Sequence, residues 1–168
     1  MKPNIIIVEG IDRVGKSTLV NRIIEEFDYK LFVQVNDLSR ELRNRKMEIE
    51  TERLYSMISV MKLLEKDFVI IDRFHLSEFS YGIASRHYYN DEVSYIDYEL
   101  SKLNSLLIYV KPTDLNKSSK EHGMSLDRHN YLLDICYENS DMNKIKCNYL
   151  QFDYIIKKLK DSFKEGGA

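Results

Sequence analysis

Four short apolar runs without regular polar alternation mark the chain, and a weaker fifth run follows them. They cover residues 4–8, 30–35, 67–71, 105–110 and, more weakly, 146–152. The longer segments between them place apolar residues at i, i+3 and i+4, as in LVNRIIEEF and ERLYSMISVMKLLEK. Strands that are apolar on both faces are typical of parallel sheets covered by helices, whereas the 3.6-residue period indicates amphipathic helices. The pattern therefore predicts a three-layer α/β domain with a parallel sheet of about five strands between helices.

Composition narrows the class of protein without naming a function. A chain of 168 residues is most simply one domain, 1–168, and 43% hydrophobic with 31% charged residues is ordinary for a globular protein. The net charge of −2 gives no global sign of a nucleic-acid or membrane surface. No apolar run approaches the roughly 20 residues of a membrane span. The two cysteines, Cys136 and Cys147, lack metal-ligand spacing, so we expect reduced thiols in a cytoplasmic protein.

The first run leads into the segment GIDRVGKS, a full match to the phosphate-loop pattern G-x-x-x-x-G-K-S/T, with a predicted helix directly after it. Glycines let the backbone curl so that its N–H groups point at phosphate oxygens, and the helix N-terminus adds partial positive charge. In this pattern Lys16 reaches the β and γ phosphates of a nucleoside triphosphate, and the hydroxyl of Ser17 is a ligand for Mg²⁺. The predicted ATP phosphate site consists of Gly10, Ile11, Asp12, Arg13, Val14, Gly15, Lys16, Ser17 and Thr18.

A second polar site follows the third run, where Asp72 and Arg73 stand at the predicted end of a strand. The carboxylate of Asp72 is suited to hold Mg²⁺ through water or to accept a proton from an attacking oxygen. The planar guanidinium of Arg73 is suited to bidentate phosphate binding. Ser77 and Tyr81 follow on a predicted helix and are candidates to line an acceptor pocket. The alternative is a structural ion pair at a strand end.

Together, the segments IVEGIDRVGKST and IIDRFHLSEFSYG resemble the thymidylate kinases, within the wider group of nucleoside monophosphate and deoxynucleoside kinases. The resemblance implies a P-loop kinase fold with strand order 2-3-1-4-5 and a short lid at about residues 114–125. It also implies Mg²⁺-dependent transfer of the γ-phosphoryl of ATP to the 5′-phosphate of a small nucleotide. Asp12 would then lie near the 3′-hydroxyl of the acceptor sugar, Arg73 would bind the acceptor phosphate, and Asp72 would lie near the metal.

The arginine inside the phosphate loop has a counterpart in one branch of the thymidylate kinases. In that branch a basic loop residue stabilises the transferring phosphoryl group, and the lid lacks the arginine that the other branch uses. The candidate lid, DLNKSSKEHGMS, contains Lys117, Lys120 and His122 but no arginine. The predicted catalytic residues are therefore Arg13, Lys16 and Asp72. A solvated Arg13 without a role is the alternative.

The chain departs from the thymidylate kinase pattern around the acceptor base. The Phe-Pro-x-Arg stretch of that family is missing, and Arg40, Arg43 and Arg45 are either its substitutes or a solvated helix face. Tyr55 falls where the family stacks an aromatic ring on the base, but it fits a core position equally well. The base-reading arginine that usually follows is replaced by Ser59. The pattern therefore favours dTMP or a related, modified pyrimidine nucleotide without identifying the base.

Other acceptors and another class of protein remain as alternatives. The acceptor can instead be a deoxynucleoside, or a 5′-hydroxyl or modified base on a polynucleotide. A regulatory protein that binds nucleotide without transferring phosphate is the alternative of a different class, although the guanine-reading motif Asn/Thr-Lys-x-Asp is missing. Glu9, at the end of the first run, either hydrogen-bonds near the loop or acceptor or has no role there. The sequence is compatible with a homodimer.

Overall fold

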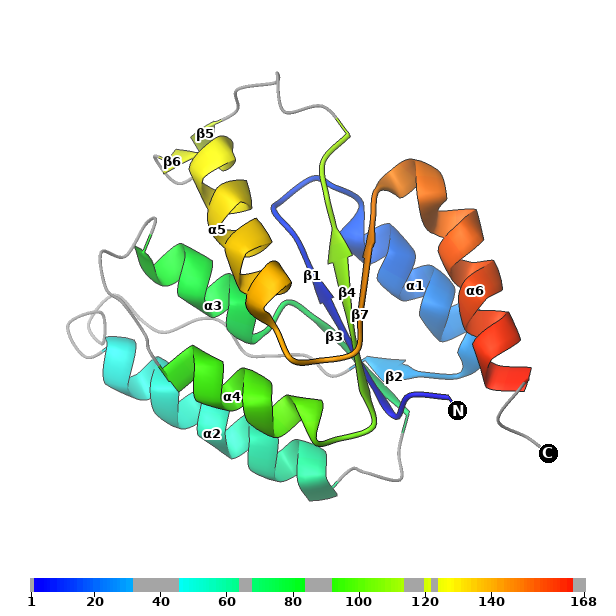
Figure 1. The fold of residues 1–168 in the computed structure, drawn as a ribbon, viewed down its shortest axis with the longest axis horizontal. Helices are drawn as coiled ribbons and strands as arrows, with labels where there is room; N and C mark the ends of the chain where they lie inside the picture. Colours follow the sequence, from blue (N-terminus) through cyan, green and yellow to red (C-terminus); the bar gives the residue numbers. More distant parts are fainter. Residues whose placement is uncertain are drawn as a thin grey trace.

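The computed structural model describes residues 2–31, 46–63, 68–83, 92–113, 120–121 and 124–164. Its main sheet contains five parallel strands in the order β2-β3-β1-β4-β7 (Figure 1). The strands are β1 (Ile5–Glu9), β2 (Lys30–Leu31), β3 (Val69–Asp72), β4 (Ser105–Val110) and β7 (Lys144–Cys147). In chain order of the sheet strands this is 2-3-1-4-5, so the predicted α/β fold and strand order are confirmed.

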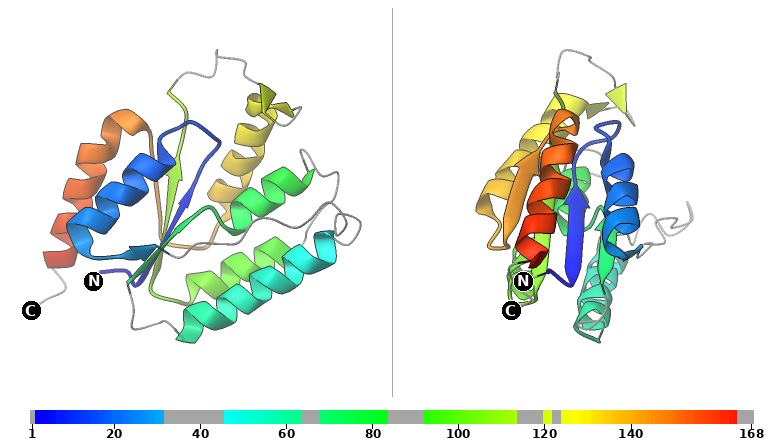
Figure 2. Two further views of the ribbon diagram at one scale, coloured as in Figure 1. Left: turned by 180° about the vertical axis from the view of Figure 1, so that it is seen from behind. Right: turned by 90° about the vertical axis from the view of Figure 1, so that its right-hand side faces the viewer.

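Helices cover both faces of the sheet. They are α1 (Lys16–Phe27), α2 (Lys46–Leu63), α3 (His75–Tyr81), α4 (Glu92–Ser101), α5 (Leu126–Asn139) and α6 (Phe152–Lys164). Helices α1 and α6 pack on one face, whereas α3, α4 and α5 lie on the other, with α2 beside α4 (Figures 1 and 2). Every residue of β1 and of β4 is buried, as expected for strands enclosed between two layers of helices.

Strand register brings the chain's polar segments to one edge of the sheet. Val8 lies opposite Asp72 and Glu9 lies opposite Tyr109, so β1, β3 and β4 end at nearly the same level. In parallel α/β sheets, the crevice outside the carboxyl ends of the strands is the usual ligand site. The phosphate loop after β1 and Arg73 after β3 therefore emerge side by side.

The prediction of a fifth strand over 146–152 was wrong in its position. The strand β7 ends at Cys147, and residues Tyr149–Gln151 form a 3₁₀ helix, η3, that leads into α6. The side chain of Asn148 accepts a hydrogen bond from the N–H of Leu150, and the side chain of Gln151 accepts one from the N–H of Asn148. This reciprocal cap satisfies the backbone locally and ends the strand.

Several predicted segments fall partly outside the described residues. Only residues 30–31 of the predicted strand 30–35 are described, and Arg40, Arg43 and Arg45 lie outside the described ranges. Within the predicted lid, β5 (Lys120–Glu121) pairs antiparallel with β6 (Met124–Ser125), whereas Lys117 and His122 are not described. Among the described residues, no helix has both the length and the apolar character needed to cross a membrane.

Candidate active site

The phosphate loop packs tightly on the end of β4. Gly10 has φ 148° and Gly15 has φ 92°, both in the region that favours glycine. A Cβ atom on Gly10 would lie 2.4 Å from the carbonyl oxygen of Val110. Ile11 and Val14 are buried and anchor the loop to the core. The backbone conformation therefore favours glycine at both positions, and the space beneath the loop also requires it at Gly10.

Positive charge gathers around this loop. Lys16 begins α1 and is only 6% exposed, and its ammonium group donates a hydrogen bond to the carbonyl oxygen of Ile11 at 2.7 Å. The same ammonium lies 4.0 Å from Oδ1 of Asp12. Arg13 is exposed and has φ 63°, so it stands at the outer surface of the loop. Lys16 stands at the N-terminus of α1, which itself attracts anions, and Arg13 lies in the loop that leads into it. This arrangement fits a polyphosphate.

Two oxygen ligands meet where α1 and β3 approach each other. The hydroxyl of Ser17 donates a hydrogen bond to Oδ2 of Asp72 at 3.3 Å. The other carboxylate oxygen of Asp72 is buried and has no hydrogen-bond partner among the described residues. A hard cation such as Mg²⁺ is bound through one or two protein oxygens together with phosphate and water, so this donor set fits it. The described residues contain no cluster of three or more His, Cys, Asp or Glu side chains suited to a metal ion.

The structure joins Arg73 to the phosphate loop. Its backbone has φ 67°, and its N–H donates to the carbonyl oxygen of Val8 at 2.9 Å, which holds it against β1. Its guanidinium contacts the carboxylate of Asp12 and donates through Nη1 to the hydroxyl of Tyr81 at 2.8 Å. That hydroxyl also lies 3.3 Å from Oδ2 of Asp12, to which it donates. Three predicted acceptor residues, Asp12, Arg73 and Tyr81, therefore form one contact cluster.

Glu9, the last residue of β1, binds the start of α3 at the same edge of the sheet. It is fully buried and accepts hydrogen bonds from the N–H groups of Phe74, Leu76 and Ser77 at 2.9, 3.1 and 3.3 Å. The hydroxyl of Ser77 also donates to its carboxylate. A carboxylate at this place satisfies the free N–H groups at the start of α3. Ser77 is thus buried with its hydroxyl directed at Glu9, and the pair sets the position of the helix that carries Tyr81.

His129 belongs to the site but was not singled out in the sequence. It lies on α5, is 2% exposed, and its ring centroid is 3.8 Å from that of Tyr81. Burial, followed by the positive charges of Arg73 and Lys16, lowers the pKa of His129 to about 4. Its Nε2 has no hydrogen-bond partner among the described residues. A single histidine without ligand spacing gives no sequence signal, and only the packing of α5 on α3 reveals this contact.

Tyr55 is placed between two helices. Its hydroxyl donates to the carboxylate of Glu92, and its ring centroid lies 5.8 Å from that of Tyr95, so it links α2 to α4. Tyr55 is half-buried next to the core residue Leu54. Ser59, one turn later, donates to the carbonyl oxygen of Tyr55 at 3.3 Å. The structure thus shows Tyr55 in contact with α4, and its predicted place beside the acceptor base stays a prediction.

The fold is shared with nucleoside and nucleotide kinases. The YorR protein of Bacillus subtilis, solved in complex with phosphorylated GDP, matches with a TM-score of 0.69 and 20% identity, covering 95% of both chains. Deoxyadenosine kinase from M. mycoides with the products dCMP and dCDP matches with a TM-score of 0.58 and 15% identity, covering 94% of this chain and 99% of that one. Thymidylate kinase from Candida albicans matches with a TM-score of 0.57 and 16% identity, covering 98% and 92%.

Sequence comparison adds no closer relative. No protein-family model and no curated protein matches the chain. At these identities the structural likeness shows the fold alone. The P-loop kinase fold is therefore established, whereas the reaction has to be argued from the site.

Proposed function

We propose that the protein transfers the γ-phosphoryl group of ATP to a deoxynucleoside 5′-monophosphate, dTMP or a related pyrimidine nucleotide, to give the diphosphate. The observation that carries this proposal is the contact between Arg73 and Asp12, because it puts an anion-binding arginine directly beside the phosphate loop. A donor and an acceptor that both carry phosphate need two cationic positions this close together. The fold shared with nucleotide kinases supports the proposal.

On the donor side, the loop amides and Lys16 bind the ATP phosphates. The ammonium of Lys16 donates to the carbonyl oxygen of Ile11 and would exchange that acceptor for phosphate oxygens when nucleotide binds. Arg13 reaches the γ-phosphoryl group from the outer surface of the loop. Negative charge spreads over the equatorial oxygens of that group during transfer, and a guanidinium at this place is worth about 10³–10⁵ in rate in phosphoryl-transfer enzymes.

Ser17 and Asp72 would hold Mg²⁺, with Asp72 acting directly or through water. When bound, the ion neutralises part of the charge on the β and γ phosphates. The fit rests on Ser17 Oγ and Asp72 Oδ2, which lie 3.3 Å apart, and on the unpartnered Oδ1 of Asp72.

On the acceptor side, Arg73 binds the 5′-phosphate as a planar fork. The carboxylate of Asp12 pairs with this guanidinium, and an incoming phosphate dianion takes the place of the carboxylate. The released carboxylate of Asp12 is then able to accept a hydrogen bond from the 3′-hydroxyl of the sugar. Tyr81 stays in contact with both residues and forms the floor of this subsite.

The experiment that tests the proposal is an acceptor screen with γ-labelled ATP. The acceptors are deoxynucleosides, deoxynucleoside 5′-monophosphates and 5′-hydroxyl oligonucleotides, each with Lys16→Ala as the blank. We expect label to appear in nucleoside diphosphates, with pyrimidine acceptors preferred. Label in nucleoside monophosphates or in oligonucleotides would replace the proposed acceptor with another one. Tight ATP binding without transfer to any acceptor would favour a regulatory nucleotide-binding protein.

A further inference from the structure

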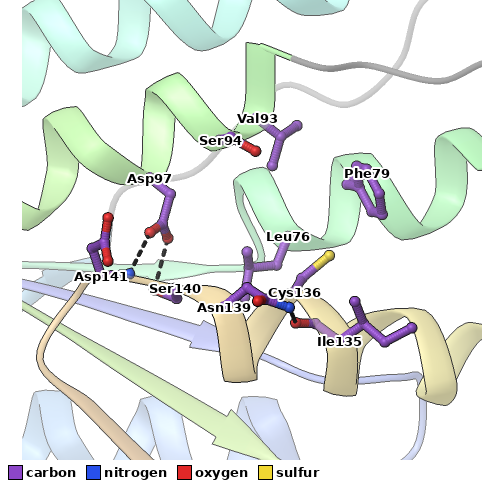
Figure 3. A pocket seen from close by; sticks show the side chains of 10 residues that line it. All are labelled: Leu76, Phe79, Val93, Ser94, Asp97, Ile135, Cys136, Asn139, Ser140 and Asp141. Atoms are coloured by element: carbon purple, nitrogen blue, oxygen red, sulfur yellow. Dashed lines mark hydrogen bonds between the residues drawn. The ribbon is translucent and has the colours of Figure 1, made fainter.

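A pocket lies between α3, α4 and α5 (Figure 3). Its volume is ≈ 290 Å³. Its apolar walls come from all three helices and consist of Leu76, Phe79, Val93 and Ile135. Leu76 and Phe79 are three residues apart and share one face of α3, whereas Ser77 and Tyr81 share the opposite face. The pocket is therefore separate from the phosphate loop and from Arg73.

One end of the pocket carries a buried carboxylate. Asp97 is 7% exposed, and its Oδ1 lies 2.8 Å from both Nε2 of His75 and the hydroxyl of Ser140. Its Oδ2 accepts a hydrogen bond from the N–H of Asp141 at 2.8 Å. Burial pushes the pKa of Asp97 upward, but these hydrogen bonds and the electrostatic interaction with His75 outweigh burial and hold it below its ordinary value. The carboxylate is therefore ionised at neutral pH.

The imidazole of His75 is the basic group in contact with this carboxylate in the part of the chain that the structure describes. The Nδ1 of His75 is buried and has no hydrogen-bond partner among the described residues. Among the residues that the structure describes, no lysine or arginine pairs with Asp97. Lys144 lies three residues after Asp141 in the chain, but its ammonium is bound to the carbonyl oxygens of Tyr137, Glu138 and Ser140.

A second carboxylate adds to the negative charge at the same end. The exposed Asp141 lines the pocket next to Asp97 (Figure 3). The apolar walls and the aromatic ring of Phe79 lie toward the other end. A cavity of about 150 Å³ holds a benzene molecule, so this pocket has room for one six-membered ring and a short charged arm.

We propose that this pocket binds a small organic cation, with its ammonium or amidinium group at Asp97 and Asp141 and a one-ring apolar body between Leu76, Phe79 and Ile135. The charge of the ligand complements the two carboxylates, and its ring covers the apolar walls. Binding here does not depend on the proposed kinase activity. It does occupy a surface of α3, the helix that carries Tyr81 on its other face.

The test is an NMR titration of the full-length protein at neutral pH with benzylamine, benzyl alcohol and methylammonium. We expect benzylamine to give saturable shifts at the methyl groups of Leu76, Val93 and Ile135. The uncharged alcohol and the ringless cation should bind at least about tenfold more weakly. Equal affinity for benzylamine and benzyl alcohol, or shifts that avoid these three residues, would overturn the proposal.

Variants separate this pocket from general attraction to surface carboxylates. Asp97→Asn should reduce benzylamine binding to the level of benzyl alcohol, whereas Asp134→Asn, an acid on α5 that pairs with Lys111 and Lys146, should leave it unchanged. Because Asp97→Asn disturbs the bonds to His75 and Ser140, Ser94→Trp provides a second arm. Ser94 is exposed at the rim, and the larger side chain fills the pocket without removing a core contact. Benzylamine binding that survives Ser94→Trp would contradict the proposal.

Discussion

The guanidinium of Arg73 contacts the carboxylate of Asp12 across the carboxyl edge of the sheet, joining the end of β3 to the phosphate loop. Carboxylate and phosphate present the same paired oxygens to an arginine fork. Asp12 therefore occupies the position that the proposed acceptor phosphate takes. Under the proposed function, Asp12 would compete with the phosphate for Arg73 and, once released, would contact the sugar.

Asp12→Asn should remove discrimination at the 3′-hydroxyl of the acceptor. An asparagine keeps the size of the side chain but is a weaker acceptor than a carboxylate, whose hydrogen bonds contribute about 1.5–3 kcal/mol. We expect the unchanged protein to prefer dTMP over 3′-deoxy-dTMP by about ten- to a hundredfold in kcat/KM, and the variant to show little preference. Equal preference in both proteins would show that Asp12 does not contact that hydroxyl.

Arg13→Ala and Lys16→Ala should separate catalysis from nucleotide binding. Arg13 is exposed at the rim of the loop, whereas Lys16 is buried within it. We expect Arg13→Ala to lower kcat by about 10³ with an ATP Kd close to that of the unchanged protein. Lys16→Ala should lose both transfer and tight ATP binding.

The control for these two variants is Arg22→Ala. Arg22 lies on α1, the helix that begins at Lys16, but it pairs with Asp153 instead of facing the loop. Its loss should leave kcat and ATP binding unchanged. Full activity in Arg13→Ala would show that this arginine is a solvated surface residue without a catalytic role.

Glu9→Gln should destabilise the fold and disturb the acceptor subsite together. The carboxylate is fully buried and accepts hydrogen bonds from three N–H groups and a hydroxyl. In glutamine, an NH₂ group replaces one of the two accepting oxygens and faces these donors. We expect the free energy of unfolding in urea to fall by about 2–4 kcal/mol, with a higher KM for the acceptor. Glu26→Gln, which removes an exposed carboxylate paired with Lys160, should change neither quantity.

Stability should fall in acid because His129 resists protonation in the folded protein. Burial and the charges of Arg73 and Lys16 lower the pKa of His129 from 6.5 to about 4, so the unfolded chain takes up a proton first as the pH falls between these values. The free energy of unfolding should therefore drop by about 3 kcal/mol over this range from this residue.

This dependence is measured as the difference between the unchanged protein and His129→Phe, which keeps a ring against Tyr81. The variant should lose that part of the slope between pH 6.5 and 4. The ring signals of His129 should also stay those of a neutral imidazole at pH 6. A protonated ring at that pH would contradict the described burial.

Local patterns predicted the parts of the molecule that are local in origin. The buried strands β1 and β4 are continuous apolar runs, and the phosphate loop is a contiguous motif whose glycines the structure shows to be required. A local pattern also caused the error at the end of β7, because the apolar residues after Cys147 resemble the continuation of a strand. The reciprocal bonds of Asn148 and Gln151 turn that segment into a helix start instead.

Contacts between distant elements could not be predicted in this way. Glu9 and Ser77 meet only because the start of α3, which follows β3, lies beside the carboxyl end of β1. His129 reaches Tyr81 only because α5 packs on α3. The sequence also did not show which helix packs against Tyr55, and in the structure Tyr55 contacts Glu92 and Tyr95 of α4. Such pairings follow from topology and register, which one-dimensional patterns do not contain.

The central claim is that Arg73 binds a phosphate on the acceptor, and it is tested by comparing dTMP with thymidine as acceptors for the unchanged protein and for Arg73→Ala. We expect the unchanged protein to favour dTMP by at least about 10³ in kcat/KM, and Arg73→Ala to lose most of this preference through a higher KM and a lower kcat. Arg22→Ala serves again as the arginine control. A preference for thymidine, or a preference for dTMP that survives the loss of Arg73, would contradict the account.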